Sequence, residues 1–212
     1  MPSATFFNLP AEKRQRLLDA AWEELTTVSF EKASINHIIR NANISRGSFY
    51  QYFADKNDLL HFLLEQACCC MEQALRQHED EHKTDAREDD LFAAALKGFD
   101  WVMARRDDKT LHLPQMIRLV QLNPEMDLSS DMALAQRNGG VLDDSAKTAR
   151  FWQTDQIKTE DHLELLCNVV GGAMLQSFRC PENAEGIREK LKKQLVILKR
   201  GMLAEPAKGA TE

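Results

Sequence analysis

The sequence predicts an all-α protein. Apolar residues recur at three- and four-residue steps through most of the chain, which is typical of amphipathic helices. The strict alternation of apolar and polar residues that is typical of half-buried strands is absent. Helix breakers are also few, because only 9 Gly and 6 Pro occur among 212 residues.

The first half of the chain contains four expected helices, and a start signal precedes each of them. Pro10 suits a first helical turn, where its missing N–H costs nothing. Ser34, Ser45 and Asp55 are of the residue types that cap helix N-termini. We therefore expect helices over about residues 10–27, 34–41, 45–53 and 55–78.

The second half is less regular. Thr159 is a candidate cap for a strongly apolar helix that Cys180-Pro181 would end. Asn123-Pro124 and Gly139-Gly140 interrupt the region between residues 107 and 156. Expected helices cover about residues 91–106, 114–122, 132–136, 159–178 and 187–202, and residues 205–212 are expected to form a frayed tail.

Composition limits the class of protein. With 43% hydrophobic and 28% charged residues, the chain resembles a soluble globular protein. The formal net charge of -6 excludes a protein that holds polyanions through bulk positive charge. No apolar run is long enough for a membrane span, and the first residues lack the pattern of a secretory signal. Five cysteines without an export signal indicate reduced thiols and a cytoplasmic location.

The net negative charge of the chain comes from one part of the sequence. Residues 1–60 contain seven Lys or Arg and seven Asp or Glu, so the whole deficit lies beyond residue 60. A neutral N-terminal head could bind nucleic acid if its cations lie on one face, while an acidic body would repel nonspecific DNA. This distribution permits DNA binding without demonstrating it.

Residues 34–53 have the pattern of a helix-turn-helix, in which two short helices flank a tight turn and a third precedes them. Asn43 tolerates the left-handed conformation that such a turn often needs. Phe49 and Phe53 lie four residues apart and can pack inward. Phosphate donors are expected at the start of the first helix near Ser34, at the Tyr52 hydroxyl and at Lys56.

Three runs in this region, Phe30–Ile39, Ala42–Phe53 and Asp55–Leu60, resemble the TetR family of transcriptional regulators. The resemblance is dense from Arg14 to Leu64. Asn43 stands where that family usually has Gly, and Arg46 and Gln51 replace a frequent Lys and a frequent His. Because the last two positions face DNA in the family, these replacements bear on which operator is recognised.

The resemblance implies a homodimeric repressor of about nine helices that binds double-stranded DNA at a palindromic operator and is released by a small-molecule effector. It implies a DNA-binding domain over residues 1–55 and an effector-binding and dimerisation domain over residues 56–204, with the long helix from Lys56 to His78 coupling them. Arg46 would read guanine and Gln51 adenine, although an exposed arginine on a solvated turn is the simpler alternative. The expected DNA contacts are Ser34, Ser45, Arg46, Gly47, Ser48, Tyr50, Gln51, Tyr52 and Lys56.

Two further residue sets belong to the expected body. Large apolar residues could line a pocket for an apolar or aromatic effector, although such residues more often form core. The pocket set is Phe62, Phe99, Met103, Met116, Trp152, Met174 and Phe178. The resemblance implies an intersubunit four-helix bundle, and the stripes suited to it are Leu163, Leu166, Val170, Ala173, Ile187, Leu191, Leu195 and Leu198.

Other chemistry finds little support in the sequence. Consecutive residues Cys68, Cys69 and Cys70 would point about 100° apart on a helix, so they cannot converge on one metal ion and are interpreted as small core residues. The chain has no Gly-rich phosphate loop and no nucleophile elbow. We therefore expect no cofactor, no metal, no membrane contact and no enzymatic activity. The alternative function is a helical ligand-binding or interaction protein that has lost sequence-specific DNA binding.

Overall fold

The computed structural model describes residues 2–81, 91–126, 128 and 159–202. Every regular element in these residues is helical, which confirms the all-α prediction. The α-helices are α1 (Ala4–Phe7), α2 (Ala11–Thr27), α3 (Ile35–Asn41), α4 (Arg46–Tyr52), α5 (Lys56–Glu81), α6 (Leu91–Ala104), α7 (Leu113–Leu122), α10 (Thr159–Arg179) and α11 (Ala184–Met202). Two 3₁₀ turns, Lys109–Leu111 and Pro181–Asn183, precede α7 and α11.

These bounds agree with the expected helices to within a few residues. Pro10 is the N-cap of α2 and so lies one position before the first turn in which we expected it. The short helix α1 was not expected. The helix expected at 132–136 and the tail at 205–212 lie outside the described residues.

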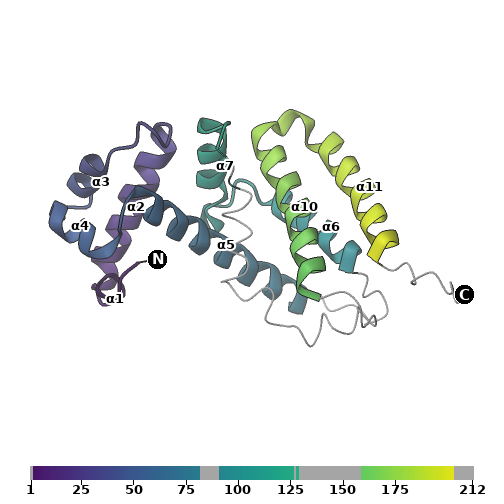
Figure 1. The fold of residues 1–212 in the computed structure, drawn as a ribbon, viewed down its shortest axis with the longest axis horizontal. Coiled ribbons are helices and arrows are strands. Elements are labelled where there is room, and N and C mark those ends of the chain that lie inside the picture. Colours follow the sequence, from purple (N-terminus) through teal and green to yellow (C-terminus); the bar gives the residue numbers. More distant parts are fainter. Residues whose placement is uncertain (1, 82–90, 127, 129–158, 203–212) are drawn as a thin grey trace, which may run out of the picture.

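Figure 1 shows the head, α1–α4, at one end of the molecule and the antiparallel pair α10 and α11 at the other. Helix α5 runs from the head toward the body, and α7 contacts α2, α5 and α10. The N-terminus lies at the head, and the chain leaves α11 at the opposite end. The head therefore meets the body through two helices, α5 and α7.

Two clusters of buried side chains form the core. The first joins the head to α5 and α7 and includes Leu17, Phe49 and Met116. The second joins α6, α10 and α11 around Phe99 and Leu191. The half-buried side chains of Met103 and Met174 pack against both clusters.

A candidate nucleic-acid interface on the head

The turn between α3 and α4 has the conformation that the sequence predicts. Asn43 has a positive φ of 53°, a left-handed conformation that few residues other than Gly adopt without strain. The N–H of Ile44 donates to the carbonyl of Ile39 at 3.0 Å, and that of Asn43 donates to Arg40 at 3.2 Å. These two bonds form a Schellman motif, which satisfies the carbonyls at the end of α3.

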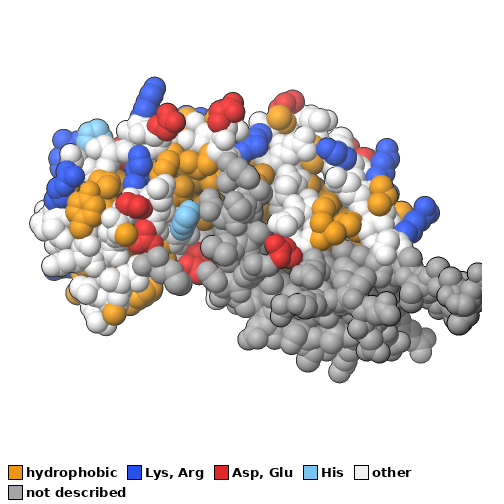
Figure 2. Space-filling model, in the orientation of Figure 1, with side chains coloured by type: hydrophobic (Ala, Val, Ile, Leu, Met, Phe, Trp, Pro, Cys, Tyr) orange, Lys and Arg blue, Asp and Glu red, His pale blue; other side chains and the backbone are white. Residues whose placement is uncertain are grey.

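Helix α4 is fixed at its start and along its apolar face. The Ser45 hydroxyl oxygen accepts a hydrogen bond from the N–H of Ser48 at 3.0 Å, as an N-cap does. Phe49 and Phe53 are 0% and 1% exposed, so both pack inward as expected. The opposite face of α4, with Arg46 and Gln51, is exposed. Figure 2 shows Lys and Arg side chains gathered at this edge of the head, over α3 and α4.

Three exposed side chains form an ordered array on this face. The Arg46 guanidinium donates to Asn36 Oδ1 at 2.9 Å and to the Tyr50 hydroxyl at 3.4 Å. Its central carbon lies 5.6 Å from the centroid of the Tyr50 ring, and Tyr50 is 46% exposed. Arg46 is therefore held in one direction by neighbours from α3 and α4, although its guanidinium stays accessible.

A groove of about 240 Å³ lies beside this array, and Ser34, Asn36, Arg46 and Lys56 are among its lining residues. Gly47 lies on the same exposed face. A Cβ added to Gly47 would meet nothing closer than the Ser45 hydroxyl oxygen at 3.9 Å. The fold itself therefore does not require Gly at this position.

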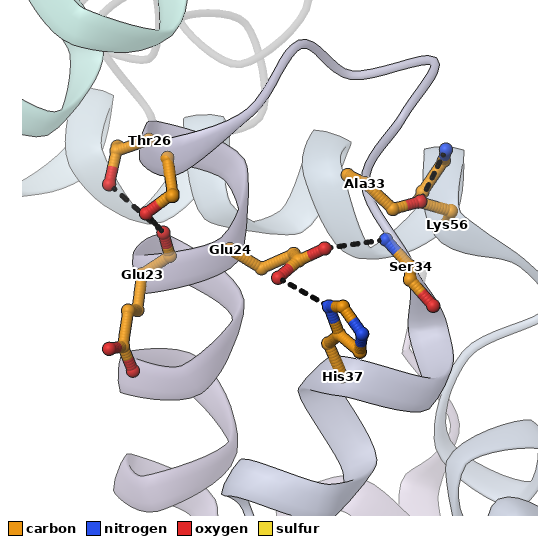
Figure 3. A network of polar contacts seen from close by, with 8 residues as sticks. Glu23, Glu24, Thr26, Ala33, Ser34, His37 and Lys56 are labelled. Carbon is orange, nitrogen blue, oxygen red and sulfur yellow. Dashed lines mark hydrogen bonds and ion pairs between the residues drawn. The ribbon is translucent and has the colours of Figure 1, made fainter.

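Ser34 and Lys56, both expected to contact phosphate, are engaged within the chain. The N–H of Ser34 donates to Glu24 Oε1 at 2.8 Å, and the other oxygen of Glu24 lies 3.5 Å from His37 Nδ1 (Figure 3). The Lys56 ammonium donates to the carbonyls of Phe30 and Ala33 at 2.5 and 2.9 Å. Lys56 thus ties the start of α5 to the loop before α3, and its phosphate contact stays a prediction.

Tyr52 packs in the head core, at 9% exposure, with its ring centroid 6.2 Å from that of Phe6. Most of the Tyr52 side chain is therefore buried in the head. The phosphate contact of its hydroxyl also stays a prediction. Substitutions at Tyr52 or Lys56 would disturb the fold as well as any DNA contact. Arg46, Tyr50 and Gln51 are better placed for a test of binding alone.

The residues expected to line an effector pocket are divided between the two buried clusters, although Met103 and Met174 pack against both. Phe62 lies in the aromatic cluster of the head, with its ring centroid 5.2 Å from Phe6 and 5.9 Å from Phe53. Phe99 belongs to the cluster of α6, α10 and α11, whereas Met116 and Phe178 belong to the other. We therefore remove Phe62 from the pocket set, and Trp152 lies outside the described residues.

The stripe expected at the dimer interface needs correction. Five of its residues are 0–7% exposed within a single protomer, where they pack in the cluster that contains Phe92 and Phe99 of α6. They are Leu166, Ala173, Ile187, Leu191 and Leu195. Val170 and Leu198 are half-buried against the same cluster, and the side chain of Leu163 is outside the described set.

The exposed face of α10 and α11 is offset by one residue from that stripe. Leu165, Val196 and Ile197 are 46%, 44% and 68% exposed. Between the two helices lies a groove of about 380 Å³, with Gly172 and Gln194 among its lining residues. Figure 2 shows apolar side chains among Lys and Arg side chains over this pair of helices.

Residues 17–62 match the family model described as bacterial regulatory proteins, tetR family. The head of this chain is therefore similar to the DNA-binding segment of the TetR family. Its curated relatives include HTH-type transcriptional regulator BetI of Serratia proteamaculans, which is 31% identical over 124 residues, or 52% of this chain and 61% of that protein. BetI of Yersinia pestis is 29% identical over 122 residues with the same coverage. The chain thus spans less than two thirds of the length of these relatives.

Solved TetR-family structures share the fold. The fatty acid degradation regulator FadR of Bacillus halodurans is 16% identical, with a TM-score of 0.56 over 93% of this chain and 100% of that chain. FadR of Thermus thermophilus, solved in complex with lauroyl-CoA, is 18% identical, with a TM-score of 0.52 over 94% and 100% of the two chains. At these identities the likeness concerns the fold alone.

Sequence reasoning missed Asn36 as a partner of Arg46, and it missed α1. An exposed polar residue at the start of the first helix was the available signal for Asn36, because the two helices of a helix-turn-helix are joined by a short turn and lie close together. Among the described residues, no helix is long and apolar enough to cross a membrane. Nor do three or more His, Cys, Asp or Glu of this described set come together as metal ligands would.

Proposed function

We propose that this chain is a DNA-binding transcriptional regulator that acts in the cytoplasm as a homodimer on a palindromic operator. The observation that supports this most directly is the array of Asn36, Arg46 and Tyr50 on the exposed face of α4. A guanidinium held in one direction loses little freedom when it forms two hydrogen bonds with a guanine. Such a bidentate contact discriminates against a wrong base by about 1–3 kcal/mol. The head is proposed as residues 1–55 and the body as residues 56–204.

The dimer is proposed to form through the exposed face of α10 and α11. Leu165 and Ile197 lie on this face, together with the groove that contains Gly172. A two-fold axis through it would present two heads on one side of the dimer. Half-sites one helical turn apart, about 34–36 Å, are the separation that such a dimer would read.

An effector site is proposed among α6, α7 and α10. Four buried side-chain polar atoms have no hydrogen-bond partner among the described residues: Trp101 Nε1 of α6, His112 Nδ1 before α7, Gln115 Oε1 of α7 and Ser177 Oγ of α10. Buried polar groups are nearly always paired, so a set of this kind supports a site for a ligand with polar groups. We therefore expect an effector with an apolar body and with groups that both accept and donate hydrogen bonds. Thermus thermophilus FadR, solved in complex with lauroyl-CoA, is a precedent for a ligand with an apolar acyl chain in this fold.

Helix α7 is proposed to carry the effector signal to the head, alongside the long helix α5. Asn123, just after α7, accepts a hydrogen bond at 2.7 Å from the N–H of Phe30 in the loop before α3. At the other end of α7, the His112 ring stacks on Trp22 of α2 with centroids 5.6 Å apart. Displacement of α7 by a ligand would therefore move the head. A switch from about 99% to 1% operator-competent protein requires that the effector prefer the released state by about 5.5 kcal/mol.

Selection of bound fragments from a random DNA pool tests the proposed function. We expect a palindromic consensus, with affinity that falls steeply as salt is raised. Arg46→Ala should lower discrimination at one base position of each half-site by about 1–3 kcal/mol. Lys13→Ala is a matched control, because Lys13 is an exposed cation of α2 outside the array. If a dimeric, folded protein selects no sequence, the alternative of a ligand-binding or interaction protein replaces this proposal.

A further inference from the structure

The first residues of the chain form a structure that lies before the family match, which begins at residue 17. Helix α1, Ala4–Phe7, packs against α4. It is also attached to α2, because the Arg14 guanidinium donates to the Phe7 carbonyl at 3.2 Å. The segment from Ser3 to Phe7, here called the brace, therefore connects the first long helix of the head to α4.

The brace caps the C-terminal end of α4. The last carbonyls of any helix lack partners inside that helix, and α4 has only seven residues. The N–H of Ser3 donates to the Tyr52 carbonyl at 2.9 Å, and the Ser3 hydroxyl donates to the Gln51 carbonyl at 2.5 Å. Ser3 thus satisfies two of these carbonyls from a distance of 48 residues in the sequence.

Phe6 holds the brace in place through packing. Its side chain is 0% exposed, and its ring centroid lies 5.0 Å from that of Phe53 and 5.2 Å from that of Phe62. The ring therefore lies where α4 ends and α5 begins. Phe7, the next residue, is 52% exposed, so the two neighbouring aromatic residues differ in environment.

We propose that Ser3 and Phe6 are positioning residues for sequence reading, an inference that rests on the proposed function. The start of α4 is fixed by Ser45 and by the turn at Asn43, whereas its C-terminal end is fixed by the brace. The Ser3 hydroxyl bonds to the backbone of Gln51, the residue expected to read adenine. Loss of the brace lets this end of α4 fray, which broadens the directions of the Gln51 side chain while Arg46 stays in place.

Two substitutions remove the brace by different means. Phe6→Ala removes the buried ring. Ser3→Pro removes both donors without backbone strain, because the φ of Ser3, -71°, is one that proline adopts. Phe7→Ala is the matched control, since it deletes an exposed ring from the same helix. Phe6→Leu keeps an apolar side chain at the buried position and should restore part of the effect.

The measurements are affinity for the selected operator, affinity for each single-base change in it, and hydrogen exchange of the α4 amides. In Phe6→Ala and Ser3→Pro, discrimination should fall by about tenfold at the base positions that Gln51→Ala also affects. Discrimination at the positions affected by Arg46→Ala, and affinity for nonspecific DNA, should not change. Exchange should accelerate at the C-terminal end of α4, and Phe7→Ala should behave as the unsubstituted chain.

Equal weakening on all sequences would overturn the proposal, because it would indicate a purely structural role. Unchanged discrimination in Ser3→Pro would overturn it too, even if Phe6→Ala failed to fold. If the unsubstituted protein selects no DNA sequence, the proposed function fails and the reading role of the brace fails with it. Hydrogen exchange then still decides separately whether the brace orders α4, because unchanged exchange in both variants contradicts that role.

Discussion

Replacement of Lys56 by Met should destabilise the head, because the structure makes this lysine a link between α5 and the loop before α3. Its ammonium donates to the carbonyls of Phe30 and Ala33 and lies 4.5 Å from the centroid of the Phe30 ring. Hydrogen bonds to a charged group contribute about 1.5–3 kcal/mol, and a cation–π contact adds about 0.5–1 kcal/mol. Met keeps the apolar stem but makes neither contact, and the partly exposed carbonyls regain some water. We expect a loss of about 2 kcal/mol.

Urea unfolding followed by circular dichroism measures this loss as a lower midpoint with an unchanged slope. Lys32→Met is the control, because Lys32 is an exposed cation of the same loop, and its effect should stay within about 0.5 kcal/mol. Equal effects of the two substitutions would refute the structural role of Lys56. The salt dependence of DNA binding separately tests the expected phosphate contact, because one lost contact lowers the slope by about 0.9.

Three further predictions concern the first turn of α4 and the contacts between α7 and the head. Asn123→Ala leaves the N–H of Phe30 without its acceptor, which should cost about 1–3 kcal/mol in urea unfolding; a loss below about 0.5 kcal/mol would contradict the contact. Gly47→Ala should raise stability by about 0.5–1 kcal/mol yet weaken operator binding, since a Cβ fits the fold but would face DNA; unchanged affinity would show that no close approach occurs there. Burial lowers the pKa of His112 below its ordinary value of 6.5, more than the charge of Asp19 raises it. The unfolded chain then binds more protons below pH 6.5, so stability should fall as the pH drops through the folded-state pKa. His112→Asn should flatten that part of a stability profile, and an unaltered profile would exclude His112 as the group responsible.

The parts of the head that the sequence predicted correctly are those governed by local rules. The left-handed Asn43, the Ser45 cap and the inward Phe49 each depend on residues within a few positions, so residue type and spacing suffice to place them. Lys56 shows the limit of such reasoning. A cation after a helix-turn-helix suggests a phosphate contact, but its actual partners are carbonyls 23 and 26 residues earlier in the chain. Only the path of the folded loop brings them together.

The same limit explains why the sequence placed the dimer interface on the apolar stripe of α10 and α11. An apolar stripe reports that one face of a helix is buried, but it does not report whether the same chain or a second copy covers it. In this chain α6 covers the most continuous stripe, around Leu191, so that face belongs to the protomer. The neighbouring face mixes exposed Leu165 and Ile197 with Gly172, Gln194 and lysines. Interfaces between copies of a chain often combine apolar residues with polar residues at the rim. The less hydrophobic face is therefore the better candidate for an interface between copies, and Ile197 is the position at which a charge would separate the two interpretations.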